Sequence, residues 1–191
     1  MANRMNVTRN LFLAIVASLI GCATSSDVYH DPNMDFGAIQ TVAVMPLGNF
    51  TRDNLTADRV RDVLMNKLLA TGALYVLPIG EVARGTAKAE IVSPVAPSPE
   101  EVVKLGGIIK AQAVIIGAVK EYGEVRAGTT SANVISVSLQ MVETQTGRIV
   151  WSSSSAKGGI SVGDRLFGGG GQPMETVTGD AVDDLIKKLF K

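Results

Sequence analysis

SPEEVVKLGGIIKAQAVIIGAV, residues 98–119, is the stretch of sequence on which the fold depends. Ser98 and Glu101 have the types and the spacing of a capping box, which predicts a helix start. The helix is expected to end near Lys110, before the uninterrupted apolar run Ala113–Val119. Such a run is typical of a central strand that is covered on both faces. The stretch therefore predicts a helix that leads into a buried strand.

The residues before this unit predict the same alternation of strand and helix. Thr41–Pro46 has the pattern of a buried strand that a proline stops, and Tyr75–Pro78 has the pattern of a shorter one. Between them, Thr56–Thr71 is expected to be a helix that Gly72 ends. The apolar positions of this helix share one stripe and are Val60, Val63, Leu64 and Leu68. Residues 85–97, which contain two prolines, are expected to be irregular.

The residues after the central strand predict a hairpin. Apolar and polar residues alternate from Ile135 to Met141, as in a strand with one exposed face. Residues 144–147 (TQTG) are expected to form the turn, and Arg148–Trp151 begins the return strand. Trp151 is expected in the core or at an interface. The serines that follow are expected to extend this strand as an exposed, unpaired edge.

The C-terminal part predicts a loop and a final helix. Residues 158–173 are rich in glycine, and residues 177–190 carry an apolar face with helical spacing. The predicted order is strand, helix, strand, helix, strand, strand, strand, helix. We therefore expect one α/β domain over residues 41–191, with a mixed sheet of about five strands and helices packed on it. No internal repeat and no second domain is evident.

The N-terminus has the features of a secretory signal. Arg4 and Arg9 precede the ten-residue apolar run Leu11–Ile20, which is too short to span about 30 Å of hydrocarbon. Small polar residues follow the lone Cys22. Leu19, Ile20, Gly21 and Cys22 resemble the lipobox of bacterial lipoproteins. An ordinary signal peptide with an incidental cysteine, or an uncleaved anchor, is the alternative.

The lipobox resemblance implies how the chain is processed and where it resides. Residues 1–21 would be removed, and Cys22 would carry a diacylglycerol and an acylated amino terminus. Stable anchoring needs two or more acyl chains, and the implied lipid would supply them without a transmembrane helix. Residues 22–40 are expected to be the lipidated end and a tether. Ala23 stands where an aspartate often causes retention in the inner membrane, so the resemblance implies the outer membrane, facing the periplasm.

Composition excludes several classes of function. The chain has 18 basic and 18 acidic residues, and two of the arginines lie in the signal, so nucleic-acid binding is not supported. Its single cysteine would be lipidated, which leaves no thiol for a disulfide. With one histidine, His30, no metal site or cofactor is expected, and no small-molecule substrate is evident.

Two motifs could suggest catalysis or phosphate binding. Residues 159–163 (GISVG) match the nucleophile elbow G-x-S-x-G, with Ser161 as the nucleophile. The base of such a triad should follow the serine, whereas His30 precedes it, so a serine hydrolase is only a remote alternative. The run of four glycines before Gln172-Pro173 has no Gly-Lys-Ser/Thr sequence, so it predicts a flexible loop and not a phosphate-binding loop.

Several segments together resemble a known group of lipoproteins. They are the lipobox, the strand of residues 42–47 with Asn49 after it, the strand of residues 113–117, and the hairpin of residues 146–151. They look like the curli-secretion lipoprotein CsgG, the penicillin-binding-protein activator LpoB and the N-terminal domain of TolB. Members of this group are not enzymes: they bind other envelope proteins or assemble into rings. The chain departs from CsgG because no pair of long alternating strands with an apolar side that could face lipid is evident.

We therefore expect a non-enzymatic accessory or scaffold of a cell-envelope machine, serving secretion and assembly or cell-wall synthesis. Its partners would be the membrane, through the lipid, and envelope proteins or further copies of itself. A subunit of a CsgG-like secretion pore is the alternative. Residues 85–97 and the loop 158–173 are expected contact surfaces. Within the expected surfaces, the candidate contact residues are Ser152, Ser153, Ser154, Ser155, Gly168, Gly169, Gly170 and Gly171.

Overall fold

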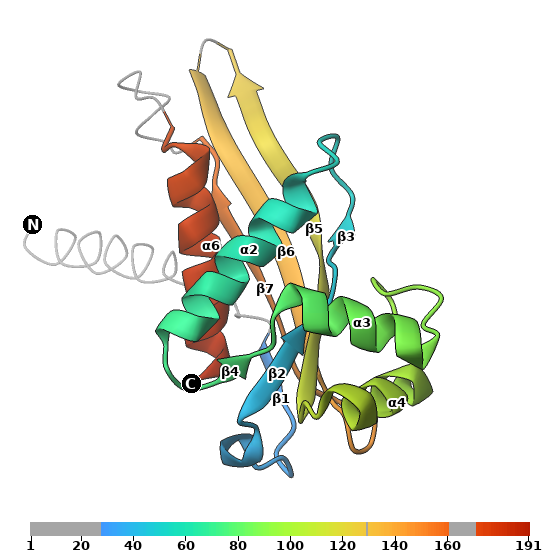
Figure 1. Ribbon diagram of the computed structural model, residues 1–191. Coiled ribbons are helices and arrows are strands. Elements are labelled where there is room, and N and C mark those ends of the chain that lie inside the picture. Colours follow the sequence, from blue (N-terminus) through green and yellow to red (C-terminus); the bar gives the residue numbers. More distant parts are fainter. Residues whose placement is uncertain (1–27, 129, 161–170) are drawn as a thin grey trace, which may run out of the picture.

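A computed structural model describes residues 28–128, 130–160 and 171–191. They form one α/β domain with a mixed sheet of seven strands, in the order β1-β7-β6-β5-β2-β4, with β3 paired to β5 (Figure 1). The predicted class is confirmed, although the sheet has two more strands than the expected five. The strands are β1 (Val28–His30), β2 (Thr41–Val44), β3 (Gly48–Asn49), β4 (Tyr75–Val76), β5 (Ala113–Ala127), β6 (Thr130–Glu143) and β7 (Ile149–Gly158).

The helices cover both faces of the sheet. They are α2 (Thr56–Ala70), α3 (Ile79–Ala89), α4 (Pro99–Ile109) and α6 (Met174–Leu189), with a short 3-10 helix η1 (Phe36–Ala38) before β2. Val42 and Val44 of β2 pack in one hydrophobic cluster with α2 and α6. The intervening Ala43, with Met45, belongs to a second cluster with α3 and α4. Because successive side chains of a strand point to opposite faces, the two helix pairs lie on opposite sides of the sheet.

The parallel part of the sheet is built from two crossovers. β2 pairs in parallel with β4 on one side and with β5 on the other. The chain passes from β2 to β4 through α2, and from β4 to β5 through α3 and α4. These crossovers therefore run over opposite faces, and the connections diverge beyond the carboxyl ends of β2 and β4.

The predicted helices are confirmed. Ser98 accepts a hydrogen bond from the backbone N–H of Glu101, whose side chain accepts one from the backbone N–H of Ser98, so the capping box of α4 is complete. α2 ends before Gly72, which has a φ of 65°. No helix among the described residues is long and apolar enough to cross a membrane.

The expectation of an irregular segment over residues 85–97 is wrong for its first part, because α3 extends to Ala89. Gly85 does not break this helix. A β-carbon at Gly85 would collide with the side chain of Ile109, so the glycine lets α3 and α4 pack closely. The residues between Glu90 and Ser98 are irregular, as expected.

The hairpin of β5 and β6 is much longer than its apolar cores predict. The strands pair from Ala113 with Glu143 to Ala127 with Thr130, so the chain has a long strand pair that its sequence does not predict (Figure 1). A bulge between Val119 and Glu121 shifts the register in which β5 pairs with β6. Beyond it, charged residues and Gly123 replace the apolar pattern, so the sequence there resembles a loop.

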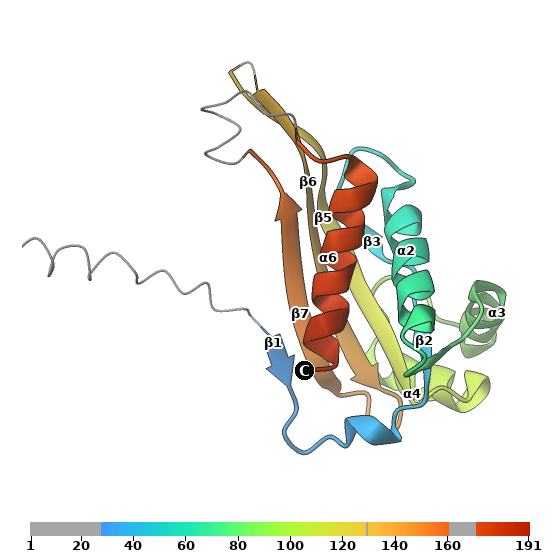
Figure 2. The same cartoon turned by 90° about the vertical axis from the view of Figure 1, so that its left-hand side faces the viewer.

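The segment of residues 28–40, expected to be part of a tether, is packed on the domain. β1 pairs antiparallel with β7, beside the C-terminal end of α6 (Figure 2). Val28 and Phe36 contact the core beneath α6. Asp31 is 5% exposed and lies 3.0 Å from the guanidinium of Arg148. The folded domain thus includes β1 and η1.

Candidate protein-binding site

Several of the predicted functional residues lie outside the described part of the chain. They are Leu19, Ile20, Gly21 and Cys22 of the lipobox, Ser161 of the G-x-S-x-G motif, and Gly168, Gly169 and Gly170. Gly171 is described, and its backbone N–H donates to the carbonyl of Ser131 on β6. The structure therefore locates only Gly171 and the four serines among the candidate contact residues.

The serine run of β7 is not the free edge that the sequence predicts. Ser152 and Ser153 pair with β1. The next carbonyl, that of Ser154, accepts a hydrogen bond of 2.8 Å from Nζ of Lys188 on α6. Ser153 and Ser155 are buried under α6, which contradicts their expected exposure. Because neighbours occupy most of this edge, strand addition at Ser152–Ser154 is disfavoured.

Trp151, at the start of this run, is a core residue. Its side chain is 1% exposed, and its Nε1–H donates to the carbonyl of Lys188 at 3.3 Å. The same lysine pairs with Asp184 at 2.7 Å. Although partial burial opposes the shift, the hydrogen bond from Lys188 holds the pKa of Asp184 below its ordinary value. These contacts fix α6 on β7.

The serines that point away from α6 form part of a different surface. Register places Ser154 of β7 beside Ser138 of β6, which lies beside Ala118 of β5, and Ser152 beside Gln140, which lies beside Ile116. We call these six residues the open sheet face. All six are at least partly exposed, although they lie on the central strands of the sheet. Apart from Ile116, which packs partly against the cluster beneath α3 and α4, the face is lined by small or polar, uncharged side chains, so a partner could approach most of its backbone closely.

The alternation of Ser136, Ser138 and Gln140 with apolar residues predicts an exposed side of β6 from sequence. The set of residues that makes up the open sheet face could not be predicted from the alternation along one strand. It combines residues of β5, β6 and β7 whose proximity depends on register.

The outer part of the β5–β6 hairpin carries charge. Arg126 pairs with Glu124 at 2.9 Å, and hydrogen bonds from Ser131 and Arg126 lower the pKa of Glu124. Val125, between them, is 39% exposed. The hairpin thus presents both charges and an apolar side chain to a partner.

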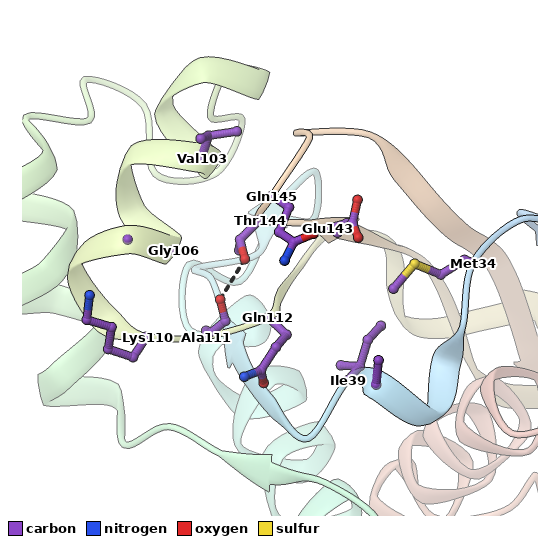
Figure 3. A pocket seen from close by; sticks show the side chains of 12 residues that line it. Met34, Ile39, Val103, Gly106, Lys110, Ala111, Gln112, Glu143, Thr144 and Gln145 are labelled. Atoms are coloured by element: carbon purple, nitrogen blue, oxygen red, sulfur yellow. Dashed lines mark hydrogen bonds between the residues drawn. The ribbon is translucent and has the colours of Figure 1, made fainter.

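A cleft with a volume of about 560 Å³ lies between α4, the β6–β7 turn and the segment before β2 (Figure 3). Two of its polar side chains are hydrogen-bonded within the domain. Thr144 donates its hydroxyl to the carbonyl of Ala111 at 2.6 Å, and Oε1 of Gln112 accepts the backbone N–H of Thr41 at 2.7 Å. Lys110 and Glu143 also line the cleft. The cleft offers hydrogen-bonding groups but no nucleophile with a base beside it.

His30 lies on β1, and its ring packs edge-on against Phe36 with the ring centres 5.4 Å apart. Across residues 28–128, 130–160 and 171–191, no group of three His, Cys, Asp or Glu side chains could hold a metal ion.

Comparison with known proteins gives one family and several similar structures. The family model described as peptidoglycan-synthase activator LpoB matches residues 14–156. No curated protein matches the chain.

Two solved structures share the fold. A variant of PelC from Paraburkholderia phytofirmans, a dodecamer, has a TM-score of 0.57 and 17% identity, over 85% of this chain and 96% of that one. Lipoprotein GNA1162 from Neisseria meningitidis has a TM-score of 0.55 and 20% identity, over 79% of this chain and 98% of that one. At these identities the similarity shows the fold alone.

Proposed function

Because the chain belongs to the LpoB family of peptidoglycan-synthase activators, we propose that it is a non-enzymatic accessory of cell-wall synthesis that acts through protein contacts. The observation that carries the proposal is the family match, which extends over well more than half of the chain and includes the lipobox. The α/β domain with its open sheet face supports it. Of the two envelope processes that the sequence allows, secretion and cell-wall synthesis, the family favours cell-wall synthesis.

We also propose that Cys22 anchors the domain to the outer membrane, facing the periplasm. Six residue steps separate Cys22 from Val28, the first residue of β1. At about 3.3–3.6 Å per residue, they span roughly 20 Å even when fully extended. The domain would therefore stay close to the membrane surface, and a synthase on the opposite membrane would have to extend toward it.

The open sheet face is the contact surface that we propose for the synthase. The test is co-purification of the full-length lipoprotein with a peptidoglycan synthase of the same organism, in detergent. Ser154→Arg places a long charged side chain on this face, whereas Asn66→Arg places one on an exposed position of α2. We expect Ser154→Arg to abolish co-purification and Asn66→Arg to retain it. Equal retention by both variants would exclude this face as the contact.

A ring-forming subunit is the second candidate function. The long β5–β6 hairpin and the fold shared with a dodecamer favour it. The exposed Glu121, Glu124 and Arg126 of the hairpin would be costly in hydrocarbon, which speaks against insertion of this hairpin into a membrane. Mass photometry in detergent distinguishes the candidates, since a ring gives particles of many subunits and an accessory gives a single copy.

A further inference from the structure

A crevice opens where the two crossovers of the parallel sheet diverge. Neighbouring strands β2 and β4 lead into α2 and α3, on opposite faces of the sheet. In open α/β sheets, ligands bind beyond the carboxyl ends of the strands at such a switch point. Here the crevice has a volume of about 280 Å³. Its apolar lining includes Pro46, Ile79, Val82, Ala83, Ile91 and Pro94.

Arg61, on α2, lines this crevice although its side chain is charged. The residue is 6% exposed, and its Nε and Nη2 atoms donate to the carbonyl of Val44 at the end of β2. A guanidinium has five N–H donors, so one carbonyl leaves donors available. Burial lowers the pKa of Arg61, but an arginine side chain stays protonated in proteins.

Arg61 forms no ion pair among the described residues. Asp58 and Asp62, its neighbours on α2, attract its charge, but both are exposed to solvent and neither contacts the guanidinium as an ion pair. A neutral donor could cap the Val44 carbonyl equally well, whereas a buried cation costs free energy unless it is paired. The crevice is therefore electrostatically complementary to an anion.

Exposed apolar side chains lie in the crevice lining and in the loop that supplies part of it. Ile79 is 42% exposed, and Val92 and Val95, in the loop that contains the lining residue Pro94, are 94% and 42% exposed. A small soluble acid would leave these side chains in water. A protein segment with apolar residues on both sides of its acidic group would cover them.

We propose that this crevice binds a carboxylate that a partner protein presents between apolar side chains. The carboxylate accepts the free N–H donors of Arg61, and the flanking apolar residues cover Ile79, Val92 and Val95. The inference deepens the proposed function and rests on it for the partner being a protein.

The first test measures binding of defined peptides to the ¹⁵N-labelled full-length protein in detergent by NMR. The probes are Ac-Val-Glu-Val-NH2, its neutral counterpart Ac-Val-Gln-Val-NH2, and isovalerate, a small branched carboxylate. We expect the Glu peptide to shift the Arg61 Nε–H resonance saturably, and to bind about tenfold or more tightly than either of the others, since hydrogen bonds to charged groups are the stronger ones. Equal binding of the Glu and Gln peptides, or tighter binding of isovalerate, would overturn the proposal.

A pair of variants tests the location without changing Arg61. Ala87 lines the crevice from α3 and is exposed, so Ala87→Trp should cover the opening; Lys88→Trp, one residue on and outside the lining, is the control. We expect binding of the Glu peptide to be lost in Ala87→Trp and kept in Lys88→Trp. Binding that survives in both variants would place the peptide elsewhere and overturn the inference.

Co-purification with the synthase separates this inference from the proposed function. If Ala87→Trp loses the peptide but keeps the synthase, the crevice is not the docking site and the inference fails while the function stands. If the wild-type protein binds the Glu peptide but no synthase, the proposed function fails while the carboxylate site stands.

Discussion

Gly106, on α4, packs closely against Thr144, the residue that follows β6. A β-carbon there would collide with the side chain of Thr144, whose hydroxyl donates to the carbonyl of Ala111. The next residue, Gly107, has no neighbour within 4 Å of the position of a β-carbon. Two adjacent glycines in one helix therefore have opposite structural roles.

Alanine at these two positions should have opposite effects on stability. Gly106→Ala overpacks the contact with Thr144, so we expect the free energy of unfolding to fall by about 1–3 kcal/mol. Gly107→Ala only improves helix propensity and should raise it by up to about 1 kcal/mol. Urea denaturation followed by circular dichroism measures both. A fall of similar size in the two variants would contradict the packing role of Gly106.

Residues whose role is local could be predicted from sequence, and residues whose role is tertiary could not. The capping box of Ser98 and Glu101 is a pattern within four residues, and it was predicted correctly. Gly85 could only be interpreted as a helix breaker, because its contact with Ile109 is not visible along the chain. Arg61 on α2 has the sequence pattern of an ordinary exposed cation, and only the structure shows it under the Val44 carbonyl.

At the scale of elements, the start of α4 depends on its cap. The hydroxyl of Ser98 accepts the N–H of Glu101 at 3.2 Å. We expect Ser98→Ala to lower the free energy of unfolding by about 1 kcal/mol, as loss of such a cap does. Ser98→Asp should retain most of the stability, and Ser93→Ala, at an exposed serine of the same loop, serves as the control. Thermal unfolding measures the three variants, and an unchanged midpoint for Ser98→Ala would show that the cap contributes nothing.

Apart from α3, an 11-residue helix in a segment that was expected to be partly irregular, the elements that the sequence did not predict are short or uncovered. β1 and β3 have three and two residues, too few for a periodic pattern to be recognised. The inner part of the β5–β6 hairpin was predicted because burial leaves a pattern there: the inner part of β5 is apolar throughout, and apolar and polar residues alternate along the inner part of β6. The outer part of the hairpin is exposed and charged, so backbone pairing alone defines the strands there. β1, one of the short strands, pairs with β7, so the edge that the serines of β7 were expected to leave free is occupied.

At the scale of the whole molecule, the proposed localisation at the outer membrane depends on Cys22. The lipidation of Cys22 stays a prediction. We expect Cys22→Ala to move the protein from the membrane fraction to the soluble periplasm, or to leave it unprocessed, and to abolish palmitate labelling. Ser25→Ala, three residues on, should change neither. A Cys22→Ala protein that is correctly cleaved and still membrane-bound would show that another part of the chain holds it there.

The central claim is that the whole protein activates a peptidoglycan synthase by binding it, and the most direct measurement is the rate of glycan-strand polymerisation. A purified synthase from the same organism is supplied with fluorescent lipid II and increasing concentrations of the full-length lipoprotein. We predict a rate that rises and saturates with lipoprotein concentration, and that Ser161→Ala activates equally well because the proposed function requires no catalysis by the chain itself. A rate that is unchanged at every concentration of the folded lipoprotein would contradict the account.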